Sequence, residues 1–133
     1  MSIQLSDIEL ILYVKDVETS KEFYKKLFRI NPTLDLPTIS EFNISPNFKF
    51  AIMLNDSISK IISKDLPHPK EGNGIPRCEL YLSVKNIEFE YENAICSGAK
   101  LISPILDRDW GDRVCYFADP DGHIIAFAEK IKK

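Results

Sequence analysis

The sequence has few of the residues that build metal centres and disulfide frameworks. It contains two histidines and three cysteines among 133 residues, and no two cysteines form a C-x-x-C pair. The missing pair excludes a zinc knuckle and a thioredoxin-like centre. The cysteines stand singly in the chain, so we expect reduced thiols, as in a cytoplasmic protein.

Long apolar stretches and an excess of basic residues are also missing. No apolar run approaches the roughly 20 residues that span a bilayer, and the first residues lack the pattern of a secretory signal. Lysine and arginine number 17 against 20 aspartates and glutamates, which gives a net charge of −3. Because nucleic-acid binding depends on neutralising phosphates, we expect no nucleic-acid partner. The missing apolar run and signal pattern lead us to expect no membrane partner and a cytoplasmic location.

An internal repeat organises what is present. Residues 8–18, IELILYVKDVE, match residues 78–88, CELYLSVKNIE, at a constant offset of 70 positions. Six of the eleven positions are identical, where chance would give about one, and a duplicated structural unit explains the match.

Each copy begins with the same pattern of residues. Apolar residues alternate along 8–14 and along 78–84, as in a half-buried strand. Asp16 and Asn86 follow, and both residue types cap helices by accepting backbone N–H bonds. A helix with one apolar face is expected after each cap, and Gly98 suits the left-handed position that ends the second helix.

Further strands are expected after each helix. They fall at about 39–45 and 48–54 in the first copy, and at about 100–106, 112–118 and 123–130 in the second. The tetrapeptide DPDG at 119–122 predicts a tight turn between the last two. Proline and glycine mark a linker at about 63–77. We therefore expect an α+β fold in one domain, 1–133, with βαβββ modules at about 5–62 and 78–133.

Several motifs resemble the vicinal oxygen chelate superfamily, which includes glyoxalase I, bleomycin-resistance proteins and extradiol dioxygenases. They are YVKD at 13–16, the Phe23-Tyr24 pair on a helix, Trp110-Gly111, and YFADPDGH at 116–123. The resemblance covers nearly the whole chain and is nearest the metal-free bleomycin-resistance-like branch. It implies two modules whose sheets curl around a cup, with helices outside, and a homodimer.

The resemblance also implies where a metal would bind. In the family, ligands lie near the start of each module's first strand and on each module's last strand, which places them here at Glu9, Glu79, Ala126 and within 48–54. Alanine offers no donor, and 48–54 contains no acid or imidazole. His68 and His123 lie in a linker and a turn. We therefore expect no cofactor, with Glu9 and Glu79 as the weak alternative metal ligands.

The two glutamates lie on the strand face opposite the leucines and valines, so we expect them to point into the cup if that apolar face packs under the helices. They either give a ligand site negative character or form ion pairs with residues such as Arg77 or Arg113. Aromatic side chains supply flat contact surfaces for the same ligand. The predicted ligand-binding residues are Glu9, Tyr13, Phe50, Glu79, Tyr81, Trp110 and Tyr116.

These patterns favour a protein that sequesters an apolar or cationic small molecule without a catalytic metal, and they assign no catalytic residue. One alternative is a metal-dependent lyase or isomerase of the glyoxalase type that uses Glu9 and Glu79 as ligands. The other is a regulatory or structural dimer without a ligand.

Overall fold

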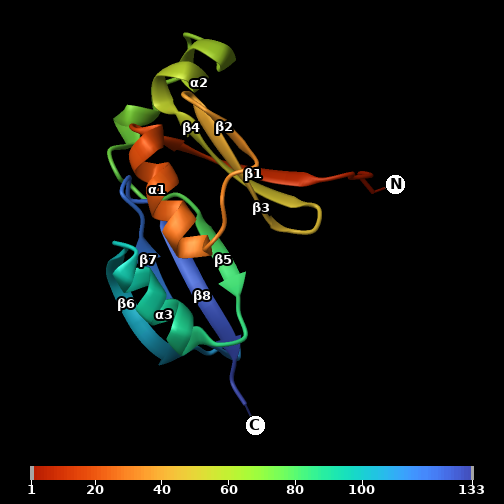
Figure 1. Ribbon diagram of the computed structural model, residues 1–133, viewed down its shortest axis with the longest axis vertical. Coiled ribbons are helices and arrows are strands. Elements are labelled where there is room, and N and C mark those ends of the chain that lie inside the picture. The colour runs from red at the N-terminus through yellow and green to blue at the C-terminus, as the bar shows by residue number, and fades with distance from the viewer. Residues whose placement is uncertain (1, 133) are drawn as a thin grey trace. The chain divides into compact units, whose positions relative to one another are not determined.

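The computed structural model describes residues 2–132 of the chain. They divide between Asn73 and Gly74 into two compact units (Figure 1). The division falls inside the stretch predicted as a linker. No helix in the described part of the chain is both long and apolar enough to cross a membrane.

The first unit contains a four-stranded mixed sheet and two α-helices. Its elements, in chain order, are β1 (Ile8–Val14), α1 (Val17–Phe28), β2 (Leu34–Leu36), β3 (Ile39–Ser45), β4 (Phe48–Leu54), α2 (Asn55–Ile62) and the 3-10 helix η1 (Pro69–Gly72). The strand order is β1-β4-β3-β2, with β1 parallel to β4 and the other pairs antiparallel.

The second unit repeats this topology. Its elements are β5 (Glu79–Ser83), α3 (Ile87–Cys96), β6 (Lys100–Asp107), β7 (Asp112–Ala118) and β8 (Ile124–Lys130). The strand order is β5-β8-β7-β6, again with one parallel pair, β5 and β8. The predicted α+β class and the two βαβββ modules are therefore confirmed.

Local sequence signals account for where the helices begin and end. The Asp16 carboxylate accepts from the backbone N–H groups of Glu18 and Thr19, and Asn86 accepts in the same way from Phe89. Gly98 has φ 96°, so it takes the left-handed position after α3, as predicted. In the DPDG turn, Gly122 has φ 91° and donates its N–H to the carbonyl of Asp119.

One face of each sheet packs against the helix that follows its first strand. In the first unit, α1 contacts β3 and β4, and the ring of Tyr24 lies 4.6 Å from that of Phe50. In the second, α3 contacts β6, β7 and β8, and Tyr91 lies 5.5 Å from Phe117. Each unit therefore has its own apolar core between its helix and its sheet.

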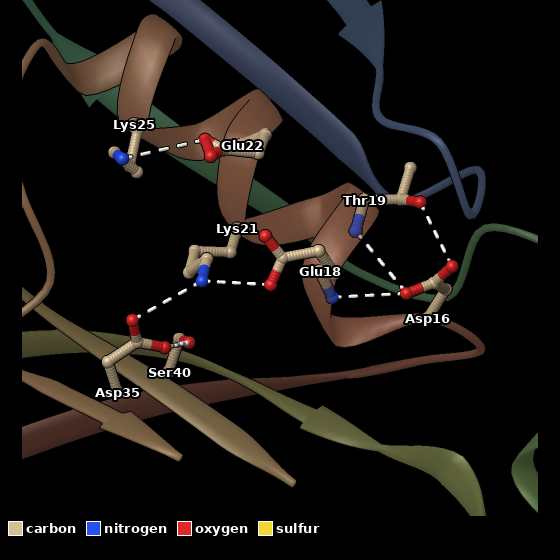
Figure 2. Close-up of polar contacts among 8 residues, drawn as sticks. All are labelled: Asp16, Glu18, Thr19, Lys21, Glu22, Lys25, Asp35 and Ser40. Atoms are coloured by element: carbon tan, nitrogen blue, oxygen red, sulfur yellow. Dashed lines mark hydrogen bonds and ion pairs between the residues drawn. The ribbon is translucent and has the colours of Figure 1, made fainter. Parts of the chain in front are cut away.

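Polar contacts fasten α1 to the edge strand β2 (Figure 2). The Lys21 ammonium lies 2.8 Å from a Glu18 carboxylate oxygen and 3.3 Å from one of Asp35. The other Asp35 oxygen accepts from the Ser40 hydroxyl at 2.9 Å. Lys21 is only 14% exposed at its side chain, so its aliphatic stem also covers apolar surface between helix and sheet.

Candidate functional site

In each sheet, the face opposite the helix carries most of the predicted ligand-binding residues. Alternation along β1 places Leu12 and Val14 in the core and leaves Glu9, Ile11 and Tyr13 on the face opposite α1. The same alternation along β5 places Leu80 in the core and leaves Glu79 and Tyr81 on the face opposite α3. The leucines and valines thus pack under the helices, which was the condition for each glutamate to lie on the opposite face of its own sheet.

Glu9 lies in a small cluster of charged side chains. It is paired with Lys49 across β1 and β4, and the Lys49 ammonium lies 3.8 Å from a carboxylate oxygen of Glu41 on β3. Desolvation raises the pKa of Glu9, and its hydrogen bond with Glu41 and the charge of Glu41 raise it further, against the opposing charge of Lys49. The ionised form of Glu9 is therefore disfavoured beside the Glu41 carboxylate.

Glu79 occupies the equivalent position in the second unit but has different neighbours. Its partner across β5 and β8 is Ile124, where Lys49 stands in the first unit. Glu79 is exposed, and no ion pair joins it to another residue in 2–132. The ion pairs considered for the glutamates do not form with Arg113, whose guanidinium contacts Glu88 and Glu129.

Phe50 lies in the core and apart from the other predicted ligand-binding residues. Its side chain is fully buried, and its ring lies 5.3 Å from that of Phe28 and 6.3 Å from that of Phe42. The pairing of Phe50 with Leu10 places it on the helix side of the sheet. The structure therefore gives Phe50 a packing role, in contrast to the expectation that it lines a ligand site.

Three of the predicted residues, Tyr81, Trp110 and Tyr116, come together in the second unit, and we name this group the aromatic platform. Tyr81 on β5 and Tyr116 on β7 flank Ala126, with which both are paired across the intervening β8. Both tyrosines pack against a buried floor of Val114, Ala126 and Ala128. Small floor residues let the rings lie close to the sheet and present their upper surfaces.

Trp110 reaches the platform from the turn between β6 and β7. Its indole N–H donates to the Tyr81 hydroxyl over 2.9 Å, and Tyr81 in turn donates to Asp112 over 2.5 Å. Gly111, with φ 95°, forms the turn that brings Trp110 back toward the sheet. Burial, together with the hydrogen bond to Asp112, raises the pKa of Tyr81, so its hydroxyl stays protonated at neutral pH.

Arg108 and Asp112 complete the platform and were not among the predicted site residues. The Arg108 guanidinium lies 5.2 Å from the centroid of the Tyr116 ring and donates to the Ser103 hydroxyl and the Val114 carbonyl, both at 3.0 Å. The sequence signal was the RDWGD segment at 108–112, where Arg108 and Asp112 close a turn through a backbone hydrogen bond of 2.8 Å. The closed turn brings Arg108, Trp110 and Asp112 onto one short segment.

The residues present do not fit the metal centre that the fold family implies. The equivalent pairings in the two units align Ala51 with Ala126, on the strands that carry the family's carboxylate ligands. Both alanines are fully buried and offer only methyl groups. Within the described residues of each unit, no three His, Cys, Asp or Glu side chains gather where they could hold an ion. Glu9 and Glu79 alone leave most coordination positions without a protein ligand.

Comparison with known proteins agrees with this architecture. Residues 8–132 match the family model described as a glyoxalase-like domain. The chain therefore belongs to the glyoxalase-like domain family, within the vicinal oxygen chelate superfamily that its motifs resemble.

Several relatives and solved structures match this chain at low sequence identity. An uncharacterized protein of Mycobacterium bovis is 26% identical over 125 residues, covering 92% of this chain and 82% of its own. An uncharacterized protein of Bacillus subtilis is 26% identical over 121 residues, covering 89% and 93%. A glyoxalase-related enzyme from Fulvimarina pelagi has a TM-score of 0.80 at 23% identity, covering 96% of this chain and 89% of that chain.

Proposed function

We propose that this protein binds a small apolar or cationic molecule on the face opposite α3 and holds it without a catalytic metal, as in the bleomycin-resistance-like branch. The aromatic platform is the observation that carries the proposal. Trp110 is 55% exposed, although indole is a large apolar group that usually packs against protein. An exposed tryptophan fixed by a hydrogen bond beside two tyrosines offers stacking surface to a ligand.

Two further observations favour binding over metal-dependent catalysis. Alanine stands at both last-strand positions, so these strands offer no ligand to the metal ion that a glyoxalase-type lyase or isomerase would use as a Lewis acid. Asp112 and Glu79 place two carboxylates near the platform against the one guanidinium of Arg108, and the rings themselves attract cations. Sequestration needs only these contacts, because it lowers the free ligand concentration without chemical change.

A ligand screen tests the proposal directly. Thermal shift is measured against a library of apolar and cationic aromatic compounds, with and without a chelator. We expect stabilising compounds whose effect the chelator leaves unchanged, and Trp110→Ala should weaken their binding about tenfold or more. Phe89→Ala is the matched control, since Phe89 is a 51% exposed aromatic on α3. Stabilisation that disappears with chelator would instead favour the metal-dependent enzyme.

We also propose that the protein acts in the cytoplasm as a homodimer. The edge strand β2 exposes Leu34 and Leu36 by 40% and 49%, and such edges are commonly covered by a partner. Sedimentation equilibrium should give twice the mass of one chain. A monomer that still binds the screened compounds would remove the dimer from the proposal and leave binding in place.

A further inference from the structure

We infer that Tyr81 is a positioning residue, which fixes Trp110 so that the ligand-binding face accepts flat aromatic rings. The inference rests on the proposed function and narrows its ligand to planar ring systems. It starts from the three-residue chain Trp110–Tyr81–Asp112, whose hydrogen bonds measure 2.9 and 2.5 Å.

The chemistry of the three groups fixes the direction of every hydrogen bond. An indole N–H only donates, and a carboxylate only accepts. Tyr81 must therefore give its proton to Asp112 and present a lone pair to Trp110. Because one hydroxyl serves both partners, the carboxylate influences the orientation of the indole through Tyr81.

The orientation of the Trp110 side chain depends on these hydrogen bonds more than that of a buried tryptophan would. It stands on the turn between β6 and β7 and is more than half exposed, so packing alone restrains it weakly. The turn backbone is closed by the Arg108–Asp112 and Gly111–Arg108 hydrogen bonds, which leaves side-chain rotation as the main remaining freedom. The bond to Tyr81 removes that rotation and holds the indole as a flat wall.

A fixed flat wall selects for flat ligands. The Tyr81 and Tyr116 rings lie on small floor residues, and Arg108 covers part of Tyr116. A planar ring gains contact along the whole indole surface, whereas a puckered ring of the same size touches it only at a few atoms. The fixed indole also loses less entropy on binding than a mobile one.

The positioning role is tested on the free protein, independently of any ligand. Trp110 is the only tryptophan, so one indole N–H resonance in a ¹⁵N spectrum reports on it. Tyr81→Phe should move this resonance upfield, speed its exchange with solvent and increase the fast component of the fluorescence anisotropy decay. Asp112→Ala should change these signals in the same direction. Asp112→Asn keeps an acceptor for the Tyr81 hydroxyl, so its indole signals should stay close to those of the unmodified protein.

Tyr116→Phe is the matched control, because no hydrogen bond joins the Tyr116 hydroxyl to Trp110 within residues 2–132. It should leave the indole resonance where it is. Unchanged indole signals in Tyr81→Phe, or equal changes in Tyr116→Phe, would overturn the positioning role.

The ligand class is tested with three probes of one skeleton, using calorimetry. Quinoline is planar and neutral, N-methylquinolinium is planar and cationic, and decahydroquinoline is puckered and cationic. At least one planar probe should bind more tightly than decahydroquinoline. Tyr81→Phe should weaken the binding of that planar probe about fivefold. Equal or tighter binding of decahydroquinoline would overturn the planar class. Failure of all three probes counts against the proposed function as well, while the indole signals still decide the role of Tyr81.

Discussion

Tyr81 and Ala126 face each other across the parallel pair β5 and β8, on the side of the sheet opposite α3. The equivalent pair in the first unit is Ile11 and Ala51. A methyl group therefore stands at the same point of both modules, where the family's metal enzymes carry a carboxylate. Ala126 is paired with Tyr81 and Tyr116. Ala51 is paired with Ile11 and Glu41. Neither methyl group can coordinate an ion.

This relationship predicts that metal has no structural role in the protein. Because Ala51 and Ala126 provide no donor atoms, prolonged chelation should leave the melting temperature unchanged, and added Zn²⁺, Ni²⁺ or Mn²⁺ should not raise it. Metal analysis of the purified protein checks the same point. Stoichiometric metal whose loss follows Glu9→Gln or Glu79→Gln would contradict the prediction and favour the lyase or isomerase.

Glu9→Gln should stabilise the protein at neutral pH. The folded state raises the pKa of Glu9 above its ordinary value, so the ionised carboxylate is disfavoured on folding and stability falls as the pH rises through that window. The amide removes this penalty, with a gain below about 1 kcal/mol because Glu9 itself is exposed to solvent. Urea unfolding at several pH values measures the effect, which should fade in acid.

Glu79→Gln is the control for that comparison. Glu79 holds the equivalent place but is paired with Ile124 and not with a lysine beside a second carboxylate. Its substitution should leave stability unchanged between acid and neutral pH. An equal gain in both variants would mean that the Glu9–Glu41 contact is not its source.

Phe50→Leu should destabilise the first unit through lost ring packing. The ring contacts Tyr24, Phe28 and Phe42, and replacing a fully buried aromatic by a smaller aliphatic side chain costs about 1–3 kcal/mol. Chemical denaturation should show a lower midpoint. The affinity of compounds from the screen should not change, and an affinity loss with unchanged stability would restore Phe50 as a ligand contact.

The sequence was sufficient to predict most of the secondary structure, because the same short-range signals occur in both modules. Alternation identified β1 and β5, and Asp16 and Asn86 identified the helix starts. Three elements were not predicted: β2, α2 and the 3-10 helix η1, which lies inside the expected linker. Strand β2 is only three residues long, and α2 begins after Leu54 without a side-chain cap, so neither carries the signals that sequence patterns depend on.

The residues of the candidate site were also predicted only in part. Tyr81 was placed correctly on the face opposite the core because its alternation with Leu80 is local to β5. Phe50 was misplaced because the face of a residue in β4 depends on register with β1, and residues 48–54 contain apolar side chains of both parities. Asp112 was missed because its role arises from a contact between β5 and β7, far apart in the sequence.

The contact between Lys21 and Asp35 predicts an acid-sensitive attachment of α1 to β2 (Figure 2). The hydrogen bond from Ser40 and the ammonium of Lys21 hold the pKa of Asp35 below its ordinary value. Its contribution to stability is therefore present above the ordinary aspartate pKa and is lost as the pH falls through the lower folded value. Asp35→Asn should reduce stability at neutral pH and show a smaller further loss in acid than the unmodified protein. Glu22→Gln alters the neighbouring Lys25 pair on the same helix. It is the control and should follow the pH profile of the unmodified protein. Identical pH profiles for Asp35→Asn and the unmodified protein would show that the Lys21–Asp35 contact does not govern the acid response.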